Sequence, residues 1–235
     1  MSGREKFKTM HSVFDNFTNR TIFKLISEGH FLGLESPVAI GKESNVFTAK
    51  KSSGKVIVKI YRLETCDFNR MYDYLKQDTR YCFLKGKRRK TIFAWVQREY
   101  RNLLKAREAG VRVPLPITFQ NNVLVMEHIG DVSPAPKLKD SIPENPKRFF
   151  DKVIIGMGQL YKAGIVHGDL SQFNILNNNE EPVFIDFSQG ISLEAQMAAE
   201  YLVRDIKNCS DFFAKLGVKE DREETRKKIL AYHKL

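Results

Sequence analysis

One polar stretch, closed on both sides by apolar residues, constrains this chain more than any other part of its sequence. It runs from Val166 to Leu176 and holds Asp169 and Asn174 five positions apart. An apolar, strand-like run then leads directly into Asp186. A fold that brings these three oxygen-bearing side chains together would suit Mg²⁺, which keeps waters and accepts nucleotide phosphates as its remaining ligands. We therefore expect phosphotransfer chemistry at this place.

Lys59 and Glu99 are the candidate phosphate-binding pair. Lys59 lies inside the strand-like run Val56–Tyr61, where an inward-pointing ammonium group needs an anion. Glu99, on the helix expected next, is predicted to pair with it while the ammonium also binds the α- and β-phosphates. Glu108 is the alternative partner on the same helix.

Two further segments are predicted to bind the nucleotide. The turn that contains Gly41 and Ser44 lies between two expected strands and could offer backbone N–H groups and a hydroxyl to phosphates. Taken alone, this single-glycine turn reads as an ordinary hairpin. Glu127 and Ile129 follow an apolar strand whose last residues include Met126, and their backbone could bind an adenine edge.

The polar residues around Asp169 have separate expected roles. Asp169 is the candidate base, or the group that orients the attacking hydroxyl. Asn174 and Asp186 are the candidate metal ligands, and His167 is expected to hold the loop by hydrogen bonds. Either acid alone would be interpreted as a helix cap or a turn residue, but their order behind the lysine and the glutamate favours one joint site.

Periodicity predicts an α+β chain with a small antiparallel sheet followed by a mainly helical region. Residues 62–90 show little periodicity and many charges, so we interpret them as a mobile insertion. We expect one domain over 1–235, with a helical extension over 1–37, a sheet lobe over 38–127 and a helical lobe over 128–235. One or two short helices are predicted from residue 14 to Gly29, and a helix of about 18 residues is predicted from Ile92 toward Gly110. The other predicted helices span 149–163, 195–216 and 220–232, and the predicted strands span 38–40, 46–49, 56–61, 117–119 and 123–126.

The composition says more about the binding partners of this chain than about its fold. The 235 residues carry a formal net charge of +11, more than nucleotide binding requires, which indicates RNA or another polyanion. The basic run Lys85, Lys87, Arg88, Arg89 and Lys90 is the expected contact surface. Three widely spaced cysteines indicate neither a disulfide framework nor a zinc site, and no apolar run is long enough to span a membrane. We expect a soluble, cytoplasmic protein.

Several motifs together resemble the RIO family of atypical serine/threonine protein kinases. Four more segments resemble the first branch of that family, which has no winged-helix domain before its nucleotide loop. The family motifs are Gly41-Lys42-Glu43-Ser44-Asn45-Val46, His167-Gly168-Asp169, Asn174 and Ile185-Asp186, and the branch motifs include Trp95 to Leu103, Val125 to Gly130, Ala135 to Asp140 and Arg204-Asp205-Ile206.

The resemblance implies a two-lobed kinase-like fold that binds ATP with Mg²⁺, or with Mn²⁺ as an alternative. It implies that Lys59 binds ATP, that Asp169 is catalytic, and that Asn174 and Asp186 bind the metal. It also implies a cytoplasmic role in maturation of the small ribosomal subunit, with rRNA and the precursor particle as partners. Family members are thought to hydrolyse ATP through an aspartyl-phosphate, which would place the phosphoryl group on Asp186.

Two departures from ordinary protein kinases keep other functions open. Ser188 stands where a glycine would follow Asp-Phe, and the short stretch after Asp186 has no Ala-Pro-Glu motif, so no activation segment is expected. ATPase-driven release from a ribosomal particle is then as plausible as protein phosphorylation. The alternatives are a small-molecule phosphotransferase of the aminoglycoside or choline type, which shares the His-Gly-Asp loop, and an ATP-gated rRNA-binding module.

Overall fold

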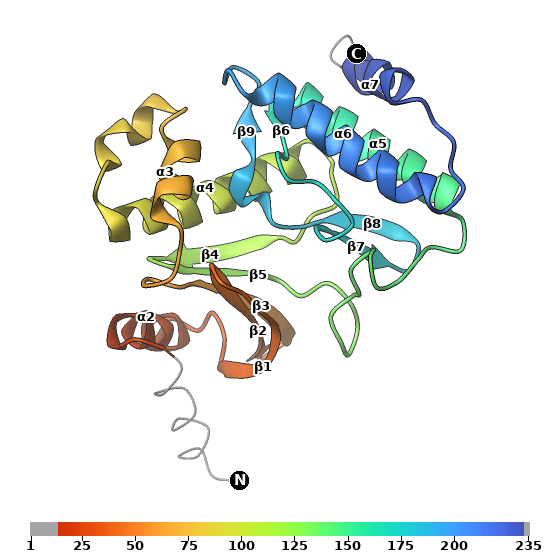
Figure 1. The fold of residues 1–235 in the computed structure, drawn as a ribbon. Coiled ribbons are helices and arrows are strands. Elements are labelled where there is room, and N and C mark those ends of the chain that lie inside the picture. Colours follow the sequence, from red (N-terminus) through yellow and green to blue (C-terminus); the bar gives the residue numbers. More distant parts are fainter. Residues whose placement is uncertain (1–13, 233–235) are drawn as a thin grey trace. The chain divides into compact units, whose positions relative to one another are not determined.

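The computed structural model describes residues 14–232, so the first part of the predicted helical extension lies outside the described residues. The chain forms two compact units (Figure 1). The first unit takes in residues up to 72 together with 84–97 and 116–128. The second takes in 73–83, 98–115 and the chain from 129 onward.

The first unit is built on a five-stranded antiparallel sheet with the strand order β1-β2-β3-β5-β4. All five predicted strands are confirmed, and helix α2 (Asn16–Ser27) confirms the predicted N-terminal helix. The strands are β1 (Gly33–Ile40), β2 (Ser44–Lys51), β3 (Gly54–Tyr61), β4 (Pro116–Gln120) and β5 (Val123–Glu127).

Strand β3 lies at the centre of this sheet because β2 and β5 pair with its two edges. Its alternate residues Val56, Val58 and Ile60 enter a buried apolar cluster, which also contains Ile22 and Leu25 of α2. Alternation along a strand sends the residues between them to the opposite face. The alternation that places Val56, Val58 and Ile60 in the core therefore places Lys59 on the opposite face of the sheet.

The prediction that residues 62–90 form a mobile insertion was wrong about their secondary structure, because helices form within this segment. Residues Phe68–Leu75 form helix α3, and a 3₁₀ helix, η1 (Thr79–Leu84), follows. The sequence signal is a helical repeat within Phe68–Leu75, which places Met71 and Leu75 on one face, and both are buried. The many charges nearby mask this short repeat.

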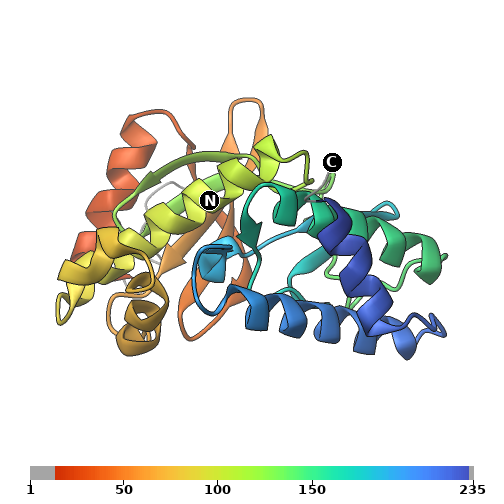
Figure 2. The same cartoon turned by 90° about the horizontal axis from the view of Figure 1, so that it is seen from above.

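The second unit is mainly helical. Helix α4 (Arg88–Glu108) enters it at residue 98. Helices α5 (Pro146–Lys162), α6 (Ala198–Ala214) and α7 (Arg222–Ala231) confirm the three predicted C-terminal helices. Figure 2 shows α7 against both α5 and α6, and all three are in mutual contact. The short strands are β6 (Ile165–Val166), which pairs with β9 (Ile191–Ser192), and β7 (Ile175–Asn178), which pairs with β8 (Glu181–Phe184).

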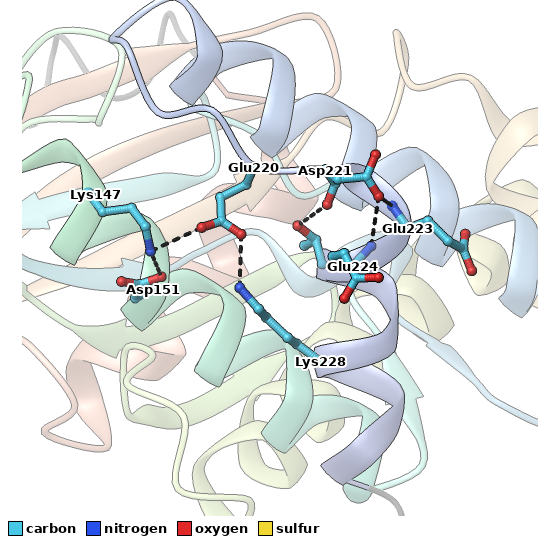
Figure 3. A network of polar contacts seen from close by, with 8 residues as sticks. Lys147, Asp151, Glu220, Asp221, Glu223, Glu224 and Lys228 are labelled. Carbon is cyan, nitrogen blue, oxygen red and sulfur yellow. Dashed lines mark hydrogen bonds and ion pairs between the residues drawn. The ribbon is translucent and has the colours of Figure 1, made fainter.

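An ion-pair network joins the start of α7 to the start of α5 (Figure 3). Glu220 lies 3.3 Å from the ammonium group of Lys147 and 2.8 Å from that of Lys228. Asp221 caps α7 by accepting from the backbone N–H groups of Glu223 and Glu224. These exposed pairs orient the helix end and contribute at most about 1 kcal/mol each. Within residues 14–232, no helix is long and apolar enough to cross a membrane.

Leu75→Ala tests whether α3 is a packed element. The Leu75 side chain is fully buried, so its truncation should lower the free energy of unfolding by about 2 to 5 kcal/mol. The control is Lys76→Ala, which removes an exposed side chain that pairs with Asp73 and should cost at most about 1 kcal/mol. Urea unfolding measures both, and equal losses in the two variants would contradict the packing of this helix.

Candidate active site

Asp169 and Asn174 face each other across the loop between β6 and β7. The Nδ2 atom of Asn174 donates to the backbone carbonyl of Asp169 at 2.9 Å and to its carboxylate Oδ2 at 3.2 Å. Gln189, which the sequence did not single out, also donates to that Oδ2, at 3.3 Å. Two amide groups therefore fix the direction of the Asp169 carboxylate.

Asp186 is joined to the same loop through its neighbour Ile185. The backbone N–H of Ile185 donates to the carbonyl of Asn174 at 3.0 Å, and Nε2 of His167 lies 3.0 Å from the Ile185 carbonyl. Because a carbonyl only accepts, this His167 nitrogen carries the proton, and the expected loop-holding role of His167 is confirmed. The fold therefore brings the residues that follow β6 and β8 to one place.

The backbone at Asp186 is left-handed, with φ 62° and ψ 65°. A residue with a side chain rarely adopts this conformation, and the structure around a functional site commonly holds it there. Ser188, the departure noted in the sequence, donates from its hydroxyl to Asp186 Oδ1 at 2.8 Å. The serine therefore orients the carboxylate at a position where glycine could not.

Asp205 of α6 binds the backbone of the loop between β6 and β7 and was not predicted as a site residue. It is 1% exposed, and its two oxygens accept from the backbone N–H groups of Gly168 and Leu170, at 2.8 and 2.9 Å. Burial raises the pKa of Asp205 to about 7, although the two N–H groups oppose this shift. A sequence signal was available, because Asp205 interrupts the apolar stripe that Leu202, Ile206 and Cys209 form on α6.

Helix α4 holds the turn that follows Asp186. Arg98 donates from Nε and one terminal nitrogen to the Gly190 carbonyl, at 3.1 and 2.7 Å. Asn102 donates to the carbonyls of Phe187 and Gly190, both at 3.0 Å. Glu99 lies beside Arg98 on this helix and is 1% exposed. The predicted partner of Lys59 therefore lies on the helical segment that fixes the Asp186 turn.

The first unit holds Lys59 and the Gly41–Ser44 turn. Lys59 is 5% exposed in the central strand, paired in register with Val46 and Leu124, and its Nζ lies 5.0 Å from the centre of the Tyr61 ring. The N–H of Gly41 donates to the Ser44 carbonyl at 3.0 Å, which closes the turn between β1 and β2. Lys59 and Glu99 belong to different units, so their pairing stays a prediction.

The predicted adenine-binding residues lie at the end of β5 and just beyond it. Met126 and Ile129 are buried, and Glu127 is the last residue of the strand. The Ile129 carbonyl accepts from the N–H of Ala135 at 2.8 Å, so this carbonyl is already used within the fold. Contact of these residues with a nucleotide stays a prediction.

The donor set fits a metal that takes part of its coordination from a nucleotide. Among residues 14–232, no group of three or more His, Cys, Asp or Glu side chains could hold an ion. Asn174 and Asp186 supply one amide oxygen and one carboxylate, which is the small protein contribution that Mg²⁺ accepts beside phosphates and water.

Comparison with known proteins decides the family. The RIO domain matches residues 45–227. This chain belongs to the RIO family. It is 41% identical to the RIO-type serine/threonine-protein kinase Rio1 of Haloferax volcanii, over 92% of this chain and 76% of that protein. It is equally similar to Rio1 of Methanocaldococcus jannaschii, over 91% of this chain and 74% of that protein.

The fold of this RIO protein is also similar to that of solved family structures. The Rio2 kinase of Chaetomium thermophilum, in its ADP/Mg²⁺-phosphoaspartate complex, matches with a TM-score of 0.67 at 21% identity. The match covers 88% of this chain and 65% of that one. The predicted kinase-like α+β fold is therefore confirmed. The RIO domain and the Rio1 relatives show that the chain is an enzyme of the kinase class.

Gly168→Ala tests the closeness of the loop between β6 and β7 to the Asp186 turn. Gly168 has φ +79°, and an added Cβ would lie 2.8 Å from the Gln189 carbonyl oxygen. Gly217 has a similar φ of +87° with nothing within 4 Å, so Gly217→Ala is the matched control. Both variants should lose about 1 to 2 kcal/mol of stability through backbone strain, and Gly168→Ala should lose more because its Cβ overlaps the Gln189 carbonyl.

Only Gly168→Ala should also lower phosphotransferase activity, by about 100-fold, because it displaces the loop by a fraction of an ångström or more. Initial rates normalised to the folded fraction measure this difference. Similar rates for the two variants would show that the close approach does not matter for catalysis.

Proposed function

We propose that this RIO protein is an Mg-ATP-dependent serine/threonine protein kinase. The observation that carries the proposal is the bonded unit of Asp169, Asn174 and Ile185-Asp186, which places a candidate base and two candidate metal ligands on one scaffold. The names of the relatives support serine and threonine as acceptors. The RIO match also favours this function over a small-molecule phosphotransferase.

In the proposed mechanism, different residues bind the attacking hydroxyl, the metal and the phosphates. Asp169 accepts or orients the proton of the attacking hydroxyl, and its two amide neighbours keep the carboxylate aimed. Asn174 and Asp186 hold Mg²⁺, or Mn²⁺ in its place, whose charge offsets that of the triphosphate. Lys59, with Glu99 as its partner, binds the α- and β-phosphates.

The remaining contacts position ATP for transfer. The Gly41 turn and the Ser44 hydroxyl cover the phosphates, and Met126, Glu127 and Ile129 bind the adenine. Because the Ile129 carbonyl is bonded to Ala135, we propose that Ile129 contributes its N–H and Glu127 its carbonyl.

We also propose that Asp186 accepts the phosphoryl group during ATP hydrolysis. The solved Rio2 complex contains phosphoaspartate, which supports this chemistry in the family. In this chain Asp186 is held in a left-handed backbone conformation with one oxygen bonded to Ser188. In this step a carboxylate oxygen of Asp186 forms a bond to the γ-phosphorus, the bond from that phosphorus to the β–γ bridging oxygen breaks, and ADP leaves; water then hydrolyses the aspartyl-phosphate and releases inorganic phosphate.

The proposed setting is cytoplasmic maturation of the small ribosomal subunit, with the precursor particle and its rRNA as partners. The basic run Lys85, Lys87, Arg88, Arg89 and Lys90 is exposed. Arg88 stacks over the Phe68 ring at 5.0 Å, and Arg89 over Phe17 at 5.3 Å. Because the arginines also pack on aromatic rings, the three lysines are the better probes of RNA contact.

Asp169→Ala should lower turnover by at least about 100-fold, because it removes the group that handles the hydroxyl proton. ATP affinity should change little, since the phosphate and adenine contacts remain. Asp140→Ala, which removes an exposed carboxylate paired with Lys139, is the control and should keep full turnover. Labelled ATP gives the rate, and wild-type turnover in Asp169→Ala would refute the catalytic assignment.

The same label separates the two proposed reactions. Acid-stable label on Ser or Thr indicates protein phosphorylation, and hydroxylamine-labile label that Asp186→Asn abolishes indicates the aspartyl-phosphate.

The triple variant Lys85→Gln, Lys87→Gln, Lys90→Gln should weaken rRNA binding and lower the slope of log affinity against log salt by up to about 3, because each lysine releases roughly one counterion. A second triple variant, Lys162→Gln, Lys215→Gln, Lys219→Gln, removes the same charge from exposed positions elsewhere. Filter binding over a salt series measures both slopes. Equal slopes for the two variants would show that the basic run does not contact RNA.

A further inference from the structure

A cavity of about 620 Å³ lies entirely within the second unit. Its lining residues lie within 74–81, on the second half of α4, at Ile165 and within 190–195. None of the residues assigned above to ATP, metal or catalysis lines it. The volume falls in the range of roughly 300 to 1,000 Å³ that small-molecule sites occupy.

Three cations of α4 follow the cavity wall, because Arg98, Arg101 and Lys105 recur at helical spacing. Arg98 is 9% exposed and committed to the Gly190 carbonyl. Arg101 and Lys105 are exposed at the rim. Within the described part of the chain, neither rim cation forms an ion pair with a carboxylate.

The described lining residues also include Asp78 and Glu194, so among them three cations meet two carboxylates and an excess of positive charge remains. Aromatic and hydroxyl groups complete the walls. Tyr74 and Tyr81 are buried, and the Tyr81 hydroxyl lies 3.4 Å from a terminal nitrogen of Arg101. The rim of the cavity therefore combines an arginine fork, an ammonium group and a phenolic hydroxyl.

We propose that this cavity binds a small organic phosphate monoester. The guanidinium of Arg101 matches two phosphoryl oxygens at once, and Lys105 adds a point charge. The Tyr74 and Tyr81 rings, with Ile191, provide the less polar walls that an organic group would contact. A simple anion would use only the rim, whereas a monoester uses the depth of the cavity as well.

Arg98 and Asn102 are not suitable for testing this site, since both hold the Gly190 turn next to the active site. The rim variant Arg101→Gln, Lys105→Gln removes two exposed charges and leaves that turn intact. Lys215→Gln, Lys219→Gln is its control, because it removes equal charge from exposed positions that do not line the cavity.

The experiment is calorimetric titration of the full chain with AMP, O-phospho-L-serine and inorganic phosphate, in saturating ADP and Mg²⁺. We expect at least one monoester to bind under these conditions, the rim variant to weaken it at least about tenfold, and the control variant to leave it unchanged. Binding of AMP alone would identify a nucleotide site, and binding of phosphoserine alone a site for phosphorylated side chains.

Three results would overturn the proposal. They are the absence of monoester binding, equal affinity of wild type and rim variant, and inorganic phosphate binding as tightly as both monoesters. Repeating the titration without ADP distinguishes a failure of the cavity proposal from a failure of the proposed kinase function. A monoester that competes with ADP and ignores the rim variant belongs to the nucleotide site, whereas loss of kinase activity alone leaves the cavity result unaffected.

Discussion

The buried carboxyl group of Asp205 is the contact on which the candidate site depends most. It accepts from the N–H groups on both sides of Asp169, and so fixes the backbone of the loop between β6 and β7 to α6. A buried acid without partners would be costly, but two backbone donors compensate for much of the lost hydration. The Arg204 guanidinium adds a hydrogen bond to the Gly168 carbonyl and stacks over Tyr201. Helix α6 is therefore both a core element and the base of the site.

The second fixed point is the Gly190 carbonyl, which accepts three N–H groups from α4. An added Cβ at Gly190 would lie 2.8 Å from Nδ2 of Asn102, so a larger residue would displace the Asn102 amide that binds this turn. Asp186 is thus held from two directions, through Asn174 on one side and through α4 on the other. Such an over-determined backbone can maintain the left-handed conformation at Asp186.

Sequence reasoning succeeded where local pattern and chemistry agreed. The alternation of Val56, Val58 and Ile60 predicted the central strand, and the spacing of Asp169 and Asn174 predicted their convergence. It failed at α3, where the apolar repeat is only two turns long and lies among charges. Sequence reasoning also missed Gln189 and Asp205. Gln189 contacts Asp169, and Asp205 contacts Gly168, and in both pairs the two residues are distant in the chain.

The sequence by itself determined the family, the element types and the identity of the catalytic candidates, since these depend on residue chemistry and short-range spacing. The tertiary structure alone decided which groups orient them. Asp205 meets Gly168 across 37 positions of the chain, and Arg98 meets Gly190 across 92. Contacts over such separations depend on how helices pack on the sheet segments, and no local pattern encodes them. The cavity of about 620 Å³ beside α4 arises in the same way, from chain segments that only the fold brings together.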